Sequence, residues 1–153
     1  MTDQQNNSGL SSKAFEKDPT RDVGFKASET IKVTDKMVRQ FAEMSGDYNP
    51  IHMDDQFAAT TRFKRRIAHG MILGALVSRF LNEKIGSGGI YLAQTLKFSN
   101  PVYIDDDITF ELEFTKLHKT RGFGTVETTA KKQSGEFVLK GEATIMMPWG
   151  IKD

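Results

Sequence analysis

The residue types around position 50 are those of an acid–base site. Asp47 and His52 lie close together in the sequence, with Asn49 and Pro50 between them. Pro50 lacks a backbone N–H group and disfavours helical backbone angles at Asn49, so the chain must bend between the carboxylate and the imidazole. Side chains that serve only the fold are usually held by regular helices and strands. Two titratable groups on a bent connection are less usual, and this placement predicts a functional site.

A third group able to take part in chemistry lies at the start of an apolar segment. Residues 71–82 are mostly apolar and predict a buried helix, and Gly70 stands at its N-terminal end. The first amides of a helix lack partners within the helix. The N–H group of Gly70 could therefore stabilise negative charge on a thioester or other carbonyl oxygen.

These three groups suit proton transfer better than covalent catalysis. The chain has no cysteine, and no serine lies in a Gly-x-Ser-x-Gly elbow. An imidazole can accept or deliver a proton near pH 7, and a carboxylate can act as its partner. Addition of water to a double bond conjugated with a carbonyl creates an enolate-like oxygen that needs a hydrogen-bond donor. Hydration or dehydration β to a carbonyl therefore uses Asp47, His52 and Gly70 together.

Each of these positions also has a purely structural explanation. Asn49 before Pro50 is a common turn pair, and His69 is more simply explained as a buried histidine. Ser78, further along the apolar helix, could donate to the carbonyl four residues earlier. No metal site is predicted, because the spacing imposes no coordination geometry on the nearby candidates Asp47, His52, Asp54 and Asp55.

Length and composition limit the class of protein. The 153 residues fit one domain, and 21 basic residues against 20 acidic residues leave a net charge of +1. This balance argues against nucleic acid or an anionic membrane as the main partner. The lack of cysteine excludes disulfides and thiolate metal sites. Residues 1–20 are polar without a secretory pattern, and predict a flexible leader before a single domain at 21–153 in a cytoplasmic protein.

Hydrophobic periodicity predicts an α+β fold. Apolar residues recur at helical spacing between Thr34, a candidate N-cap, and Gly46, a candidate C-cap, and Asp54 could cap a short helix. Alternating patterns predict strands at residues 23–33, 90–98, 108–115, 123–131 and 137–147. Such a sheet needs a cover for its apolar face, and the apolar helix can supply it. We therefore expect a hot-dog fold, an antiparallel sheet wrapped around one long apolar helix. Its exposed sheet edges predict a homodimer.

A basic run lies between the two predicted helical regions. It contains four cationic residues, Arg62, Lys64, Arg65 and Arg66. Most runs of this kind are solvated loops, and the alternative is a contact to the phosphates of a ligand such as coenzyme A. These four residues are therefore the candidates for substrate binding.

The same segments resemble a known family. Residues 41–52 (FAEMSGDYNPIH), 57–61 (FAATT) and 69–71 (HGM) are similar to the hydratase-2 motif of MaoC-like proteins. The chain is most similar to the (R)-specific enoyl-CoA hydratases, including those that supply polyhydroxyalkanoate synthesis. The resemblance covers about residues 23–148 and includes residues 90–98 and 141–143. Motif, spacing and downstream strand pattern agree.

The resemblance implies a homodimeric hydro-lyase of one hot-dog domain, which adds water to trans-2-enoyl-CoA to give (R)-3-hydroxyacyl-CoA. It implies no metal and no redox cofactor, since coenzyme A is part of the substrate. Asp47 and His52 match the catalytic pair that holds the attacking water, and Gly70 matches the amide that binds the oxyanion. Asn49 and Ser78 match supporting polar positions. The resemblance assigns the pair jointly, without deciding which member protonates the α-carbon.

The sequence departs from the family pattern in two places. Arg66 stands where related proteins often have proline, and the polar leader is longer than a minimal hydratase needs.

Three alternative functions remain. A 3-hydroxyacyl-[acyl-carrier-protein] dehydratase of fatty acid synthesis would use the same site, with the basic run facing an acidic carrier protein. A non-catalytic acyl-CoA-binding regulator would not need both Asp47 and His52, and a hot-dog thioesterase would leave His52 without a task. Acyl chain length and pathway are not predicted.

Overall fold

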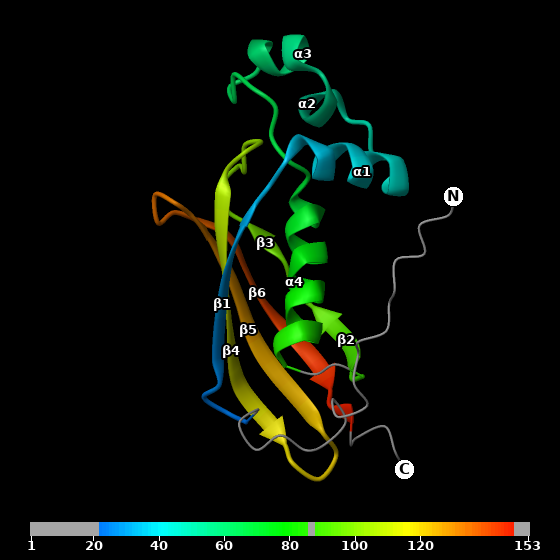
Figure 1. The fold of residues 1–153 in the computed structure, drawn as a ribbon, viewed down its shortest axis with the longest axis vertical. Helices are drawn as coiled ribbons and strands as arrows, with labels where there is room; N and C mark the ends of the chain where they lie inside the picture. The colour runs from blue at the N-terminus through cyan, green and yellow to red at the C-terminus, as the bar shows by residue number, and fades with distance from the viewer. Residues whose placement is uncertain (1–21, 86–87, 149–153) are drawn as a thin grey trace, which may run out of the picture.

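The computed structural model describes residues 22–85 and 88–148, so the leader predicted for residues 1–20 lies outside the described residues. In this part of the chain, six strands form one antiparallel sheet in the order β1, β4, β5, β6, β2, and β3 also pairs with β6 (Figure 1). The strands are β1 (Lys26–Lys32), β2 (Ile90–Gln94), β3 (Lys97–Phe98), β4 (Asp107–His118), β5 (Phe123–Lys132) and β6 (Phe137–Met146).

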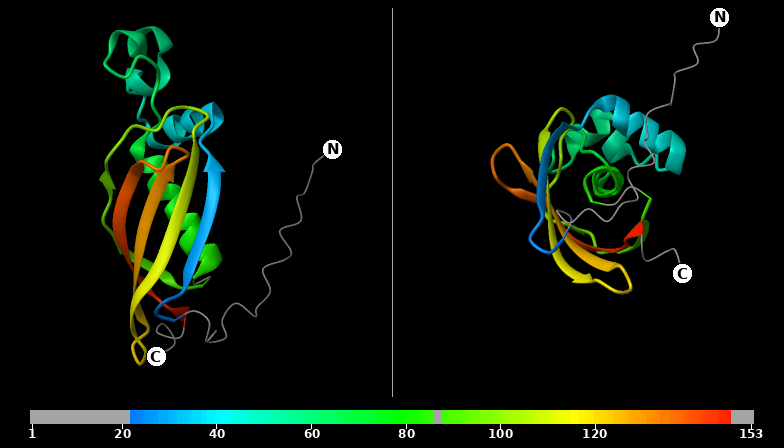
Figure 2. Two further views of the ribbon diagram at one scale, coloured as in Figure 1. Left: turned by 90° about the vertical axis from the view of Figure 1, so that its left-hand side faces the viewer. Right: turned by 60° about the horizontal axis from the view of Figure 1, so that its bottom comes forward.

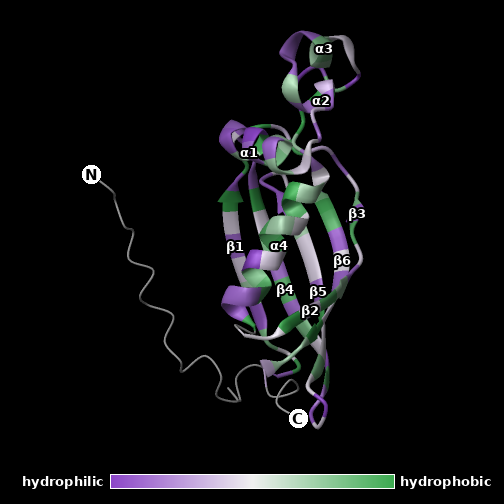
Figure 3. Cartoon of the chain, turned by 90° about the vertical axis from the view of Figure 1, so that its right-hand side faces the viewer, coloured by the Kyte–Doolittle hydropathy of each residue, from purple (hydrophilic) through white to green (hydrophobic). Residues whose placement is uncertain are grey.

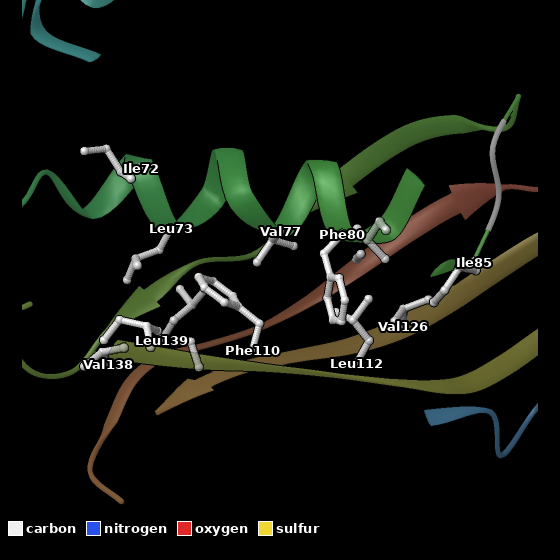
Figure 4. Close-up of a cluster of buried hydrophobic side chains, with 14 of the residues drawn as sticks. Ile72, Leu73, Val77, Phe80, Ile85, Phe110, Leu112, Val126, Val138 and Leu139 are labelled. Atoms are coloured by element: carbon white, nitrogen blue, oxygen red, sulfur yellow. The ribbon is translucent and has the colours of Figure 1, made fainter. Parts of the chain in front are cut away.

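The sheet curves around one helix, α4 (Gly70–Lys84), which Figure 2 shows end-on inside the curve of the strands. The alternation predicted for β4 is present, because every second residue is buried: Ile108, Phe110, Leu112 and Phe114. These side chains meet the inner side of α4 in the core, where Figure 4 shows Leu73, Val77 and Phe80 pointing towards the strands. The predicted hot-dog architecture is confirmed.

The sheet covers only one side of α4. The composition of this helix predicted burial nearly all round. In the structure, however, Met71 is 52% exposed, and Ala75 and Ser78 are exposed as well. Figure 3 shows this open side, with apolar turns near the N-terminus of the helix and hydrophilic residues near its C-terminus. The apolar residues on this side are therefore only partly covered by the described chain. Among the described residues, no helix is long and apolar enough to cross a membrane.

Helix α1 (Asp35–Ser45) has the two ends that the sequence predicted. The hydroxyl of Thr34 accepts a hydrogen bond from the N–H group of Met37 at 3.3 Å, which satisfies one of the unpaired amides of the first turn. Gly46 ends the helix in the left-handed region at φ 77°, where glycine avoids the strain of a Cβ atom.

Two one- to two-turn helices follow, α2 (Pro50–Met53) and α3 (Asp55–Thr60), and both lie beyond the end of the sheet (Figure 1). Asp54 caps α3 as predicted, since its carboxylate accepts from two amides of the first turn. Helix α2 was not predicted, because Pro50 was taken to exclude regular structure. Proline is tolerated at the first position of a helix, where the amide has no partner in any case. His52 therefore lies on a single helical turn.

The segment predicted as one strand at 90–98 is divided into β2 and β3. Between them, the N–H group of Thr95 donates to the carbonyl of Glu142 at 2.9 Å, and its hydroxyl accepts from the N–H group of Glu142 at 2.9 Å. Gly141 permits this approach, because a Cβ atom there would lie 1.8 Å from the carbonyl oxygen of Thr95. The division of the strand thus depends on a glycine in β6.

Replacing this glycine tests the close approach. Gly141→Ala should destabilise the protein by about 1–3 kcal/mol, because the new methyl group meets backbone that must shift. Urea unfolding followed by circular dichroism measures the free energy of unfolding. Glu142→Ala, at an exposed neighbour on the same strand, is the control and should stay close to the unsubstituted protein. Equal stability of both variants would show that β6 and Thr95 do not pack as described.

Candidate active site

His52 is held by the segment between α3 and α4, which contains Ile67. Its Nδ1 lies 2.7 Å from the carbonyl oxygen of Ile67. Because a carbonyl oxygen can only accept, Nδ1 carries the proton in this contact. In a neutral ring Nε2 then has a free lone pair and can act as a base. The backbone adds a second link here, since the N–H group of Ile67 donates to the carbonyl of Ile51 at 3.3 Å.

The surroundings of His52 favour the neutral ring. Partial burial has the largest influence and lowers the pKa of His52, and the nearby His69 lowers it further. The bond to the Ile67 carbonyl and the negative charge of Asp47 act in the opposite direction, but the net pKa of His52 lies below its ordinary value of 6.5. The lone pair on Nε2 is therefore available at neutral pH.

Asp47 lies on the exposed bend between α1 and α2, and its backbone is fixed at both sides. Its N–H group donates to the hydroxyl of Ser45 at 3.1 Å, and its carboxylate accepts from the N–H group of Asn49 at 3.2 Å. The carbonyl oxygen of Asp47 accepts from Nε2 of His69 at 2.9 Å. The loop with the carboxylate is thus attached to the N-cap residue of α4.

Asp47, His52 and His69 form one cluster. Each offers one ligating atom, and these atoms all lie within 4.8 Å of one another. The rings of His52 and His69 are 4.0 Å apart between centroids with a tilt of 34°. This group could hold a metal ion by composition, whereas Asp54 and Asp55 serve α3 and an ion pair instead. The cluster contains both members of the acid–base pair.

The role of His69 was not apparent from its residue type. It is only 2% exposed, as a core histidine would be, but its ring also joins Asp47 to α4 and lies against His52. Its Nδ1 is buried without a hydrogen-bond partner among the described residues. The sequence signals were its place next to Gly70 at the start of the apolar helix and its position in the HGM segment of the family motif.

A pocket of about 290 Å³ opens beside this cluster. His52, His69 and Gly70 line it together with Arg62 and with apolar residues, among them Leu73, Phe98 and Val138. Gly70 is the first residue of α4, where the amides have no partner within the helix. A Cβ atom at Gly70 would lie 3.1 Å from the ring of Phe98, so a larger residue would press on this ring. The structure therefore brings His52 and Gly70 to one pocket, and Asp47 lies in the cluster beside it.

Asn49 and Ser78, the two predicted supporting positions, differ in where they lie relative to the Asp47–His52 pair. The side-chain oxygen of Asn49 accepts from the N–H group of Ile51 at 3.2 Å, so Asn49 caps the helix that carries His52. Ser78 lies two turns along α4 from Gly70 and lines a separate pocket, with Tyr91 and Met146. Within the described chain, Ser78 is thus not brought to the Asp47–His52 pair.

The four cationic candidates have different surroundings. The guanidinium of Arg65 lies 4.1 Å from the ring centroid of Tyr103, and Lys64 is exposed at a positive φ of 65°. The side chain of Arg66 is mostly buried and forms ion pairs with Asp35 and Asp55. Arg62 is exposed and lines the pocket next to His52. Of the four, Arg62 is best placed to meet a ligand in this pocket.

Comparison with known proteins identifies a matching family and similar structures. Residues 15–136 match the family model described as a MaoC like domain. The (R)-specific enoyl-CoA hydratase of Aeromonas caviae is 41% identical over 128 residues, which cover 83% of this chain and 96% of that protein. A solved structure of the (R)-hydratase from A. caviae involved in PHA biosynthesis has a TM-score of 0.82 at 39% identity, covering 86% of this chain and 100% of that chain.

A relative with a different thioester carrier is also similar. The mitochondrial 3-hydroxyacyl-[acyl-carrier-protein] dehydratase of Arabidopsis thaliana is 33% identical over 129 residues, which cover 82% of this chain and 77% of that protein. The family model and these relatives each match most of the chain, and the relatives are hydratases and dehydratases. The protein therefore belongs to the MaoC-like family.

Proposed function

We propose that this protein is a hydro-lyase that adds water to trans-2-enoyl-CoA and forms (R)-3-hydroxyacyl-CoA. The observation that carries the proposal is the geometry of His52. Its Nδ1–H group donates to a backbone carbonyl, which leaves the lone pair on Nε2, while the side chain shares a cluster with Asp47 and lines a pocket together with Gly70. The similarity to (R)-specific enoyl-CoA hydratases supports the same substrate and stereochemistry.

In the proposed reaction, one water molecule lies between Asp47 and His52. His52 Nε2 accepts a proton from this water while the hydroxyl oxygen adds to C3 of the substrate. The electrons of the double bond move towards the thioester, whose oxygen becomes an enolate that the Gly70 N–H group stabilises. A proton then returns from the pair to C2, so that H and OH have been added across the double bond. Asp47 orients the water and stabilises the positive charge that develops on His52.

This chemistry needs no electron transfer, so we propose that the enzyme works without a redox cofactor. We also propose that it needs no metal, because Asp47 and His52 activate the water and the Gly70 N–H group stabilises the oxyanion. The substrate itself supplies the coenzyme A moiety. Its phosphates need a cationic contact, and Arg62 at the pocket is the candidate. A cytoplasmic location stays a prediction from the sequence.

The 3-hydroxyacyl-[acyl-carrier-protein] dehydratase is the second candidate function, because a relative with that activity is 33% identical. It would use Asp47, His52 and Gly70 in the reverse direction, and Arg62 would contact the carrier protein. An acyl-CoA-binding regulator does not require a base beside a carboxylate. A thioesterase would release free coenzyme A. These four functions differ in which substrate disappears and which product forms.

The first test is the reaction itself. Purified protein should remove the conjugated absorbance of crotonyl-CoA and give only the (R) product. Asp47→Asn should lower the rate by about 10²–10⁴-fold, or about 3–5 kcal/mol, because the variant loses one acid–base partner. Glu113→Gln, a carboxylate lost on the outer face of the sheet, is the matched control and should keep full activity.

The outcomes separate the candidates. Normal turnover by Asp47→Asn would remove Asp47 from the mechanism. Reaction of crotonyl-acyl carrier protein without reaction of crotonyl-CoA would establish the carrier-protein dehydratase. Release of free coenzyme A would indicate a thioesterase, and binding without turnover of any thioester would indicate a regulator.

The lowered pKa of His52 predicts the pH dependence of the reaction. Protonated His52 cannot accept a proton from water, so kcat/KM should fall as the pH falls through the pKa of this ring. Because that pKa lies below 6.5, the acid limb should have its midpoint below pH 6.5. In Asp47→Asn, the remaining activity should show a still lower midpoint, because the charge that raises the pKa of His52 is gone. A midpoint above pH 6.5 in the unsubstituted enzyme would contradict this assignment.

We further propose that the enzyme is a homodimer that uses the β2 edge of the sheet and the open side of α4. Strand β2 is an edge strand, and three of its apolar residues are 39–45% exposed: Ile90, Tyr91 and Leu92. Leu92 lies at a bulge between the paired residues Tyr91 and Ala93. An unpaired apolar edge next to a partly covered apolar helix supports pairing with a second copy of this chain.

Light scattering coupled to gel filtration tests the dimer. The unsubstituted protein should have the mass of two chains, and Leu92→Glu should shift it towards the mass of one chain, because a charge is placed in the apolar contact. Phe123→Glu, which changes an exposed apolar residue of β5, is the control and should stay dimeric. A single-chain mass for the unsubstituted protein at micromolar concentration would contradict the proposal.

A further inference from the structure

Arg66 occupies an unusual environment for a residue from a basic loop. Its side chain is only 10% exposed, and it lies between two carboxylates. Nη1 donates to Asp35 at 2.8 Å and Nε donates to Asp55 at 2.8 Å. Asp35 begins α1 and Asp55 begins α3, so one guanidinium group joins both helices.

The same side chain reaches the backbone of His52. Nη1 of Arg66 also donates to the carbonyl oxygen of His52 at 3.2 Å. The next residue, Ile67, accepts from the imidazole of His52 through its carbonyl. Two consecutive residues therefore hold His52 at two points, Arg66 at its main chain and Ile67 at its ring.

Helix α2 needs such external contacts. It consists of residues Pro50–Met53, and none of them is fully buried, although Met53 packs against the edge of the core. In α3, only Ala58 is buried. A single helical turn is unstable by itself, because one hydrogen bond does not offset the entropy of ordering it. Figure 2 shows α2 and α3 standing apart from the body of the sheet.

The guanidinium group of Arg66 keeps its positive charge and can therefore hold these contacts at all working pH values. Burial by itself would lower the pKa of the guanidinium, but the bonds to Asp55 and Asp35 outweigh it and raise this pKa above its ordinary value. The group stays charged at any pH at which the enzyme works. Its planar fork can donate in several fixed directions at once, which the single ammonium of lysine cannot match. A substrate phosphate would have to displace Asp35 and Asp55 to reach it.

We propose that Arg66 is a positioning residue for His52. It holds α2 against α1 and α3 so that the ring of His52 keeps its bond to Ile67 and presents Nε2 to the pocket. This proposal rests on the proposed hydration for its kinetic consequence, but the placement of the ring can be measured without any reaction.

The test compares Arg66→Met with Arg39→Met. Arg39 pairs with the same carboxylate, Asp35, at 2.8 Å, but the bonds described for it do not include His52. Arg66→Met should lower kcat for crotonyl-CoA by about 10–100-fold with KM changed less than about threefold, because a small displacement of a catalytic base is costly. Arg39→Met should change neither constant by more than about twofold.

A second measurement does not depend on turnover. The Nδ1–H proton of His52, assigned by its loss in His52→Gln, should give a slowly exchanging NMR signal in the unsubstituted protein and in Arg39→Met. In Arg66→Met this proton should exchange at least about tenfold faster, since the ring leaves the Ile67 carbonyl more often. If crotonyl-CoA is not a substrate, the proposed function fails, while this exchange rate still tests Arg66.

Three results would overturn the proposal. They are an unchanged kcat with an unchanged exchange rate, a raised KM with normal kcat, and a loss of activity that matches only the unfolded fraction of Arg66→Met. Asp35 and Asp55 are 41% and 80% exposed, so both can be hydrated when Arg66 is removed, and the variant should fold. Arg66→Lys keeps the charge and should recover part of kcat and of the proton protection. It also serves as the test variant if the methionine variant does not fold, and full activity and protection there would overturn the proposal.

Discussion

The hydrogen bond from Nδ1 of His52 to the carbonyl of Ile67 is the contact on which the proposed chemistry depends. A neutral imidazole can carry its proton on either nitrogen, and only one of the two forms leaves a base directed at the substrate. The carbonyl selects the form with a free Nε2, and it fixes the plane of the ring at the same time. Asp47 then needs only to lie nearby, which the short loop between α1 and α2 achieves.

This contact joins a rigid part of the fold to a weakly supported part. Ile67 pairs with Tyr103 in an isolated bridge, and the N–H group of Ala68 donates to the carbonyl of Val102 at 2.7 Å, so the acceptor is anchored to the body of the domain. Helix α4 begins directly after this segment and is fixed by its buried side. His52, on the half-buried turn of α2, takes its position from these neighbours. The site thus combines a preorganised oxyanion donor with a base that is tied to the same scaffold.

The sequence predicted local structure better than the contacts between distant segments. Alternation and apolar composition report burial directly, so β4 and the inner side of α4 were predicted, as was the cap at Thr34. Pro50 was taken to exclude a helix, although proline fits a first turn. The break between β2 and β3 could not be predicted, because it depends on Gly141 in another strand. The same reason applies to the site, because His69 and Arg66 contact residues that are far away in the sequence. Arg66 was predicted as a candidate for substrate binding from its charge alone.

The nitrogen NMR spectrum of the His52 ring tests the central claim most directly. With the ring assigned by comparison with His52→Gln, the account predicts a neutral imidazole at pH 7, with the proton on Nδ1 and an unprotonated Nε2. Such a ring can accept a proton from a water molecule at Nε2. A ring at pH 7 that carries its proton on Nε2, or on both nitrogens, would have no lone pair for this step and would contradict the account.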